Sequence, residues 1–297
     1  MLSALVRSMR PKQWIKNLLV LAALVFSKNL LDGAALLRSL AAFGIFCLLS
    51  GAVYIINDLV DRESDRLHPE KRRRPIAAGR VGAGPALTWA AVAVAGSLAG
   101  ALALDWQFAV VAAGYFLMQL AYSLRLKRVV VLDVLIIAVG FALRAIAGTF
   151  VIHVRLSPWL FVVTILLALF VAVAKRRHEL LFLEGQGITH RSVLGKYSEP
   201  LLDQMMAVAT SATVVAYCLY TIAPETIDKF GSRNLIFTFP FVLYGIYRYL
   251  YLVYRKELGG TPEKVFVTDL PMVVAILLWA LAVVFILYAL PALAGSR

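Results

Sequence analysis

The sequence predicts an all-α, polytopic membrane protein: a bundle of about nine transmembrane helices around a cavity that faces the cytoplasm. Hydrophobic residues make up 61% of the 297 positions, and the mean hydropathy is +0.82, whereas a soluble domain is nearer half apolar. Apolar stretches of about 20 residues, the length that spans a bilayer, recur along the chain. Lys and Arg are concentrated in alternate loops between these stretches. We expect one domain over residues 1–297.

Turn residues separate the expected helices, for example at Asp32-Gly33, Ser157-Pro158 and Pro224. The first helix is the weakest, because its apolar core is only Leu18–Phe26. Basic residues precede this run as in a signal peptide, but no small-residue cleavage site follows, so the segment is interpreted as a membrane helix. The expected spans are residues 15–31, 36–60, 84–104, 107–124, 131–152, 158–181, 203–223, 234–252 and 269–291.

Charge predicts the orientation of these helices. Of the 30 Lys and Arg residues, 23 lie in the N-terminal segment and in the segments 61–80, 125–128, 175–196 and 248–264. Because cytoplasmic loops carry excess Lys and Arg, we expect a multi-pass protein of the cell's inner (plasma) membrane. Its N-terminus and active site would be cytoplasmic and its C-terminus outside. The net charge of +13 is explained by anionic lipid, so no nucleic acid partner is expected.

A group of acidic residues follows directly on the second apolar stretch. On a helix of 3.6 residues per turn, Asp58, Asp61 and Asp65 fall within about 60° of one another, with Asn57 beside them and Glu63 on the other side. Three carboxylates on one face repel one another unless a cation lies among them. Hard oxygen ligands of this kind suit Mg²⁺, which often shares the oxygens of a substrate phosphate. We therefore expect Mg²⁺ on these four residues.

A basic run follows within a dozen residues and contains Lys71, Arg72 and Arg74. Metal ligands beside phosphate-binding cations at a helix end predict a polyphosphate substrate at the membrane surface. The alternative is a solvated helix end followed by an ordinary positively charged cytoplasmic loop. That alternative explains the basic run but not the aligned acids.

These motifs together resemble the UbiA superfamily of intramembrane prenyltransferases. NDLVDRESD followed by HPEKRRRPIAAG resembles the superfamily's first Asp-rich motif, and YSLRLKR (Tyr122–Arg128) resembles its Tyr/Lys turn. Three further segments resemble the decaprenyl-phosphate phosphoribosyltransferase branch: RPKQWIKN (Arg10–Asn17), LRAIAG (Leu143–Gly148) and AKRRHEL (Ala174–Leu180).

The resemblance implies a transferase that joins phosphoribosyl pyrophosphate to a long polyprenyl phosphate and releases pyrophosphate. It implies Mg²⁺ at the first Asp-rich motif, with Asp58, Asp61 and Asp65 in the catalytic site. It also implies substrate contacts from Tyr122 and Lys127 in the turn. A groove among the helices would hold the polyprenyl chain.

One departure from the superfamily pattern bears on the substrate. Prenyltransferases of the superfamily usually have a second acidic motif at the end of the sixth helix, where this chain has Lys175, Arg176, Arg177, His178 and Glu179. A single acid beside a lysine is a poor site for a second Mg²⁺. We expect Lys175 and Arg176 to bind the separate 5-phosphate of phosphoribosyl pyrophosphate, with Glu179 as a catalytic residue that orients the lysine or a ribose hydroxyl. Ordinary positive flanking of a membrane helix is the alternative.

Arg144 lies about 18 Å into the fifth helix. A membrane-buried Arg is costly unless it faces a partner or a polar cavity, so we expect it to bind substrate. A structural pair with another buried polar group is the alternative. Lys16, with Arg10 and Gln13, could hold the lipid phosphate.

Tyr197 and Arg248 are further substrate-binding candidates on the cytoplasmic side. For both, as for Lys16, an interfacial anchor is the competing interpretation, because Tyr and Arg favour that depth. His153 and His190 have no ligand spacing and are assigned no role.

Two other classes of function stay open. One is a prenyltransferase of the same fold that moves a prenyl group from a prenyl diphosphate to an aromatic acceptor. The other is a non-catalytic transporter or lipid-binding membrane protein, which would leave the acids without a role. The sequence also leaves homo-oligomer formation open.

Overall fold

The computed structural model describes residues 2–69, 71–155, 157–184 and 193–291. These residues form helices joined by short turns and contain no strand. Two compact units are formed, unit 1 from residues 1–156 with 190–193, and unit 2 from residues 157–189 with 194–297. The all-α class is confirmed, and the single domain expected over residues 1–297 stays a prediction.

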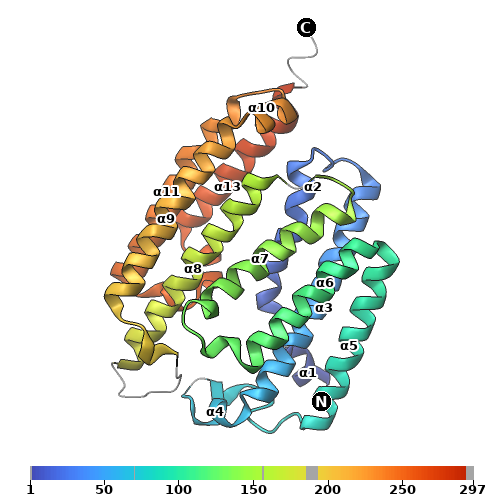
Figure 1. Cartoon of the computed structure of the whole chain (residues 1–297), viewed down its shortest axis with the longest axis vertical. Helices are drawn as coiled ribbons and strands as arrows, with labels where there is room; N and C mark the ends of the chain where they lie inside the picture. Colours follow the sequence, from blue (N-terminus) through green and yellow to red (C-terminus); the bar gives the residue numbers. More distant parts are fainter. Residues whose placement is uncertain (1, 70, 156, 185–192, 292–297) are drawn as a thin grey trace. The chain divides into compact units, whose positions relative to one another are not determined.

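Among the described residues, eight helices are long and apolar enough to cross a membrane, which confirms a multi-pass membrane protein (Figure 1). In unit 1 they are α3 (Gly33–Val60), α5 (Ala83–Leu104), α6 (Trp106–Leu124) and α7 (Leu132–Val151). In unit 2 they are α8 (Pro158–Glu184), α9 (Glu199–Ile222), α11 (Phe239–Lys256), and α13 (Leu270–Val284) with the π-helical turn η7 (Phe285–Ala289).

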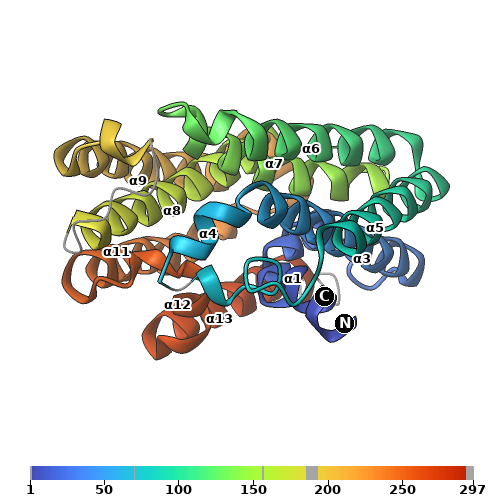
Figure 2. The ribbon, with the colours of Figure 1, turned by 90° about the horizontal axis from the view of Figure 1, so that it is seen from below.

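Short helices connect the spans. In unit 1 they are α1 (Leu2–Ser8), η1 (Pro11–Leu21), α2 (Ala22–Phe26), α4 (Arg62–Leu67), η2 (Lys71–Arg73) and η3 (Leu126–Arg128). In unit 2 they are η4 (Leu194–Lys196), α10 (Pro224–Phe230), η5 (Asn234–Thr238), η6 (Leu258–Gly260) and α12 (Pro262–Thr268). Figure 2 looks onto the end of unit 1 that carries α1 and α4.

The segment expected as the first spanning helix has a different form. Residues 15–31 contain the end of the 3₁₀ helix η1 and the short helix α2, and the chain turns after Phe26. Lys16 and Asn17 interrupt the apolar pattern, so the remaining run is too short to cross a bilayer as one α-helix. The segment instead packs along α3 and α7 inside unit 1.

Polar caps set several of the helix boundaries, including the one that Asp32-Gly33 predicted. The carboxylate of Asp32 accepts hydrogen bonds from the backbone N–H groups of Ala34 and Ala35 at 2.8 and 3.2 Å, which starts α3. Asp105 caps α6 and Asp269 caps α13 in the same way. Such caps satisfy N–H groups that have no partner within the helix.

Aromatic side chains fill the core of each unit. In unit 1 the ring of Phe46 lies 5.8 Å from Phe108 and 5.3 Å from Tyr115, between centroids. In unit 2 Phe170 meets Tyr249 edge-on at 5.3 Å. Tilted and edge-on pairs of this kind are the arrangements that aromatic rings prefer. They hold α3 to α6 in unit 1, and α8 to α11 in unit 2.

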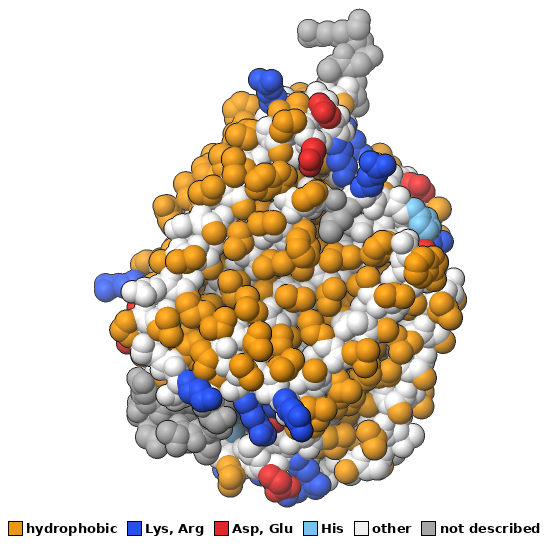
Figure 3. All heavy atoms as spheres, in the orientation of Figure 1, with side chains coloured by type: hydrophobic (Ala, Val, Ile, Leu, Met, Phe, Trp, Pro, Cys, Tyr) orange, Lys and Arg blue, Asp and Glu red, His pale blue; other side chains and the backbone are white. Residues whose placement is uncertain are grey.

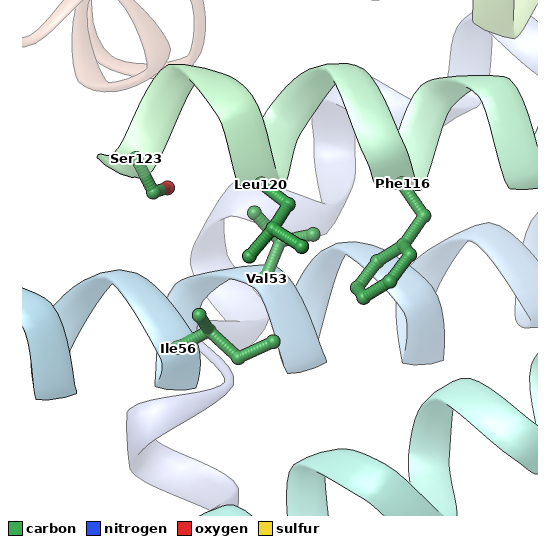
Figure 4. A pocket seen from close by; sticks show the side chains of 5 residues that line it. All are labelled: Val53, Ile56, Phe116, Leu120 and Ser123. Carbon is green, nitrogen blue, oxygen red and sulfur yellow. The ribbon is translucent and has the colours of Figure 1, made fainter. Parts of the chain in front are cut away.

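The exterior of the helices is apolar. Hydrophobic side chains cover most of the face seen in Figure 3, and charged side chains lie mainly toward helix ends. One hollow between α3 and α6 is lined by Val53, Ile56, Phe116, Leu120 and Ser123 (Figure 4). It is too narrow to admit water, so we treat it as a packing gap between two helices.

Candidate functional site

The acidic residues predicted to share one helix face lie on two helices. α3 ends at Val60, Asp61 occupies the junction, and α4 begins at Arg62. The backbone N–H of Asp61 donates to Asn57 at 2.9 Å, and that of Asp65 donates to Asp61 at 2.8 Å. These two i→i+4 hydrogen bonds carry the helical pattern across the interruption at Asp61, so the acids stay at the same end of unit 1.

Asp58 and Asp65 form one buried ionic group. Their side chains are only 2% and 5% exposed. Arg74 bridges them, with its Nη1 atom 3.1 Å from an Asp58 oxygen and 2.6 Å from an Asp65 oxygen. Arg10 adds a second ion pair to Asp58. The basic run and the first Asp-rich motif are thus brought together, because α4 and η2 fold Arg74 back over the end of α3.

Asp61 belongs to a second ionic group with Lys127. The ammonium of Lys127 lies 2.5 Å from an Asp61 oxygen and 3.5 Å from the Asn57 amide oxygen. Lys127 is 6% exposed although it carries a charge. The short helix η3 places it there, directly after α6. Lys127 of the Tyr/Lys turn therefore contacts the Asp-rich motif.

The four expected metal ligands have the donor chemistry of a Mg²⁺ site, since all offer hard oxygen atoms. In the structure, Arg10, Arg74 and Lys127 lie among them. Within the described ranges, no three or more His, Cys, Asp or Glu side chains stand together as a metal centre. The oxygen atoms of these residues suit a divalent cation. In the structure, the side chains of Arg10, Arg74 and Lys127 are paired with the carboxylates. The Mg²⁺ assignment stays a prediction.

The other predicted residues of unit 1 differ in their exposure to solvent. Arg72 is exposed on η2, whereas Lys71, Lys16 and Tyr122 are half-buried. Glu63 points away from the other acids, as expected, and its 78% exposed side chain pairs with Arg66.

Arg144 sits in a buried network of neutral partners. Its Nε donates to the Asn17 side-chain oxygen, one Nη to the Tyr115 hydroxyl and the other to the Gly140 carbonyl, each at 2.7 Å. Asn17 in turn donates to Ser50 at 3.1 Å. These contacts tie η1, α3, α6 and α7 together and agree with the structural alternative for Arg144. Substrate binding by Arg144 stays an untested prediction.

In unit 2, the arginines at the C-terminal end of α8 form ion pairs with acidic side chains of α8 and α9. Arg176 is 3% exposed and forms an ion pair with Glu179, one turn away on α8. Glu179 thus pairs with Arg176, and Lys175 is half-buried on the same helix. Arg177 pairs with Glu199 and, at 2.6 Å, with Asp203 of α9. Arg177 therefore joins α8 to α9.

Arg248 joins α11 to α13. Its Nε and Nη2 atoms donate to the two oxygens of Asp269 at 3.0 and 2.8 Å. This hydrogen-bonded pair lowers the pKa of Asp269 below its usual value. Tyr197, the remaining candidate of unit 2, is 6% exposed next to η4.

Sequence reasoning missed several partners of these side chains. Tyr54 lies one turn before Asp58 and presents its ring 4.8 Å from the Arg10 guanidinium, a position that i,i+4 spacing could have indicated. Glu199 and Asp203, spaced four residues apart at the start of α9, could have been proposed as partners for Arg177 in the same way. Nothing in the sequence linked Tyr115 to Arg144, because that contact joins separate helices.

Comparisons with known proteins agree with this fold and these motifs. The chain is 36% identical over 297 aligned residues to the decaprenyl-phosphate phosphoribosyltransferase of Mycolicibacterium smegmatis, covering 94% of this chain and 91% of that one. The enzyme of the same name from Corynebacterium glutamicum is 34% identical, with 97% and 87% covered.

Among solved structures, a UbiA homolog from Archaeoglobus fulgidus bound to GPP and Mg²⁺ superposes with a TM-score of 0.72 over 95% of this chain and 98% of that one, at 20% identity. The model of the UbiA prenyltransferase family matches residues 18–270. The chain belongs to the UbiA prenyltransferase family.

Proposed function

We propose that the protein transfers 5-phosphoribose from phosphoribosyl pyrophosphate to a polyprenyl phosphate of the decaprenyl type, and releases pyrophosphate. The observation that carries this proposal is the identity of 34–36% to relatives named decaprenyl-phosphate phosphoribosyltransferase, over nearly the full length of both chains. The basic end of α8, where Arg176 and Arg177 are buried beside Glu179, supports it.

The reaction makes and breaks one bond at the same carbon. An oxygen of the lipid phosphate attacks C1 of the ribose, and the bond from C1 to the pyrophosphate oxygen breaks with its electron pair going to pyrophosphate. The lipid phosphate is already ionised, so the protein needs no strong general base. Its main tasks are to position the two anions and to stabilise the charge of the leaving group.

The ionic groups of unit 1 suit these tasks. Asn57, Asp58, Asp61 and Asp65 would hold a divalent cation, and we propose Mg²⁺ because solved relatives of the fold contain it. When bound, Mg²⁺ would neutralise charge on the pyrophosphate group. Arg74 and the other basic-run residues, Lys71 and Arg72, would donate to phosphate oxygens. Arg74 already occupies the centre of the acidic group.

Further cations and three other side chains, Glu179, Tyr122 and Tyr197, complete the proposed set. Lys127 would contact the leaving group from its position beside Asp61. In unit 2 we assign Lys175 and Arg176 to the 5-phosphate of the donor, with Glu179 fixing Arg176. The remaining proposed substrate contacts are Lys16, Tyr122, Tyr197 and Arg248, whereas the buried network of Arg144 favours its structural alternative.

The orientation in the membrane is part of the proposal. The excess of Lys and Arg in the loops that carry these residues supports an active site and N-terminus in the cytoplasm, in the cell's inner membrane. The lipid acceptor would then meet a water-soluble donor at the cytoplasmic surface.

The direct test incubates detergent-purified protein with labelled phosphoribosyl pyrophosphate and decaprenyl phosphate, with Mg²⁺ or with EDTA. We expect a labelled lipid product with Mg²⁺ and none with EDTA. A parallel reaction offers a prenyl diphosphate and an aromatic acceptor, the substrates of the competing prenyltransferase function. Consumption of the prenyl diphosphate, with phosphoribosyl pyrophosphate left intact, would contradict the proposal.

A further inference from the structure

Residues 2–21 form an N-terminal arm, made of α1 and η1, that packs against the rest of unit 1 on both sides of Arg10. On one side, Met9 fills a notch in α3 at Gly51, where an added Cβ would lie 3.0 Å from the Cβ of Met9. Met9 is 3% exposed, and its sulfur accepts a hydrogen bond of 3.4 Å from the indole of Trp89. The start of the arm is therefore held against α3 and α5.

The other side of the arm is held by Asn17, which is 1% exposed. Its side chain donates to Ser50 at 3.1 Å and accepts from Arg144 at 2.7 Å. Farther along, Gly148 of α7 faces the backbone carbonyl of Val20 with no room for a side chain. These contacts fix η1 between α3 and α7.

Arg10 lies between these two attachments in a strained conformation. Its φ of 54° and ψ of 64° are in the left-handed region, which is costly for a residue with a side chain and is restricted further by the following Pro11. The strain directs the guanidinium over the Tyr54 ring and onto Asp58. Non-glycine residues in this region cluster at functional sites, and here the strained residue reaches a proposed catalytic acid.

The guanidinium of Arg10 has unused hydrogen-bonding capacity. It has five N–H donors, and its contacts with the residues that the structure describes are the ion pair through Nη2 to Asp58 and the face of Tyr54. Its side chain is 27% exposed, whereas that of Asp58 is 2% exposed. Asp58 also has Arg74 as a partner. Two N–H groups of Arg10 can therefore bind a second anion, while Asp58 stays paired with Arg74.

The arm also has the character of a segment at the membrane surface. Leu2, Val6, Ile15 and Leu18 are 61%, 40%, 41% and 48% exposed, and the exposed cations Arg7 and Lys12 accompany them. Helical segments with exposed apolar residues and Lys or Arg lie in the headgroup region. An anion that reaches Arg10 along this arm would be the phosphate of a membrane lipid.

We propose that Arg10 binds the phosphate of the polyprenyl phosphate acceptor, and that the N-terminal arm positions it beside Asp58. This inference rests on the proposed function, because it assigns the acceptor end of that reaction. A planar guanidinium matches two phosphate oxygens at once, which a lysine cannot do.

The test compares Arg10→Ala with Lys12→Ala, which removes one positive charge from an exposed position of the same arm. Arg10→Ala should raise KM for decaprenyl phosphate about ten- to a hundred-fold and leave KM for phosphoribosyl pyrophosphate within about two-fold. Lys12→Ala should change neither value by more than about two-fold. Arg10→Lys should recover part of the loss, because lysine keeps the positive charge but lacks the planar guanidinium that binds two phosphate oxygens at once.

A second variant tests the positioning by the arm. Gly51→Ala should push Met9 out of its notch and raise KM for decaprenyl phosphate in a wild-type Arg10 background. Met9→Ala in the same chain removes the Cε and Cγ atoms that the new methyl group meets at 2.6 and 3.2 Å but keeps the Cβ at 3.0 Å, so the double variant should recover part of the loss. An effect of Gly51→Ala that is equal for both substrates would contradict arm positioning.

Binding of labelled decaprenyl phosphate without the donor separates this inference from the proposed function. Wild-type protein should retain the lipid, and Arg10→Ala should retain it about ten-fold less well. If Arg10→Ala binds and uses the lipid as wild type does, or if only the donor's KM rises, the Arg10 assignment is wrong. If wild type binds the lipid through Arg10 but transfers no ribose, the proposed reaction is wrong and the lipid site stands.

Discussion

Replacement of Arg144 by Met separates the two interpretations of this membrane-buried cation. Met keeps the length of the aliphatic chain but removes the guanidinium. The Asn17 oxygen and the Tyr115 hydroxyl then each lose a 2.7 Å hydrogen bond from a charged donor, while the Gly140 carbonyl keeps its place in the helix. We therefore expect the variant to be destabilised through two orphaned polar groups.

The expected size follows from those two groups. Each hydrogen bond to a charged group contributes about 1.5–3 kcal/mol in water-soluble proteins, and polar contacts within membranes average about 0.6 kcal/mol with a maximum near 1.7. Loss of two such bonds should lower the free energy of unfolding by about 2–4 kcal/mol, less any relief from removing the buried charge. A cycle with Asn17→Ala should give a coupling energy of about 1–2 kcal/mol.

The assay is SDS-induced unfolding of detergent-purified protein, followed by circular dichroism at the helix band. Steady-state KM values for both substrates are measured on the same preparations. A structural role predicts a lower unfolding midpoint with KM values changed little in the protein that remains folded. Wild-type stability together with a raised KM for phosphoribosyl pyrophosphate would refute this reasoning and support direct substrate binding by Arg144.

The other predictions concern the acids, the donor and the topology. Asp58→Ala and Asp61→Ala should each abolish turnover while the helical circular dichroism stays unchanged, because these carboxylates are proposed to act on the metal and leaving group; activity near wild type would exclude that role. Lys175→Ala should raise KM for phosphoribosyl pyrophosphate about ten- to a hundred-fold, and an unchanged KM would remove it from the 5-phosphate site. A cysteine within residues 63–74 should be labelled only from the cytoplasm and one at Ser232 only from outside; the reverse pattern would overturn the orientation.

Much of the fold could be predicted because length and hydropathy dominate helix formation in a membrane. Eight of the nine expected spans correspond to eight long helices. The first did not form one spanning α-helix, because its apolar run is only Leu18–Phe26, between Lys16-Asn17 and Ser27-Lys28-Asn29, and because Asn17 binds Arg144 and Ser50 inside unit 1. Whether such a segment spans the membrane depends on contacts with residues distant in the sequence, and a local hydropathy pattern does not show those contacts.

The sequence predicted candidate site residues but not which of them form ion pairs with one another. Helical spacing placed Asp58, Asp61 and Asp65 together, yet the chain bends at Asp61, so Arg74 bridges two of the acids while Lys127 takes the third. The ion pairs depend on the conformation of the turns that carry Arg74 and Lys127. The spacing of charged residues in the sequence does not give that conformation. Arg10 was one of three candidates in the N-terminal arm, with Gln13 and Lys16. Its left-handed backbone conformation and its contacts with Asp58 and Tyr54 single it out.

The most direct measurement of the central claim follows both halves of the donor in one reaction. Phosphoribosyl pyrophosphate carries ¹⁴C in the ribose and ³²P in the β-phosphate, and is incubated with purified protein, decaprenyl phosphate and Mg²⁺. Our account predicts that ¹⁴C enters the lipid fraction and that ³²P leaves as pyrophosphate in equal molar amounts. Appearance of ³²P in the lipid, or no transfer of ¹⁴C by protein that consumes a prenyl diphosphate, would contradict it.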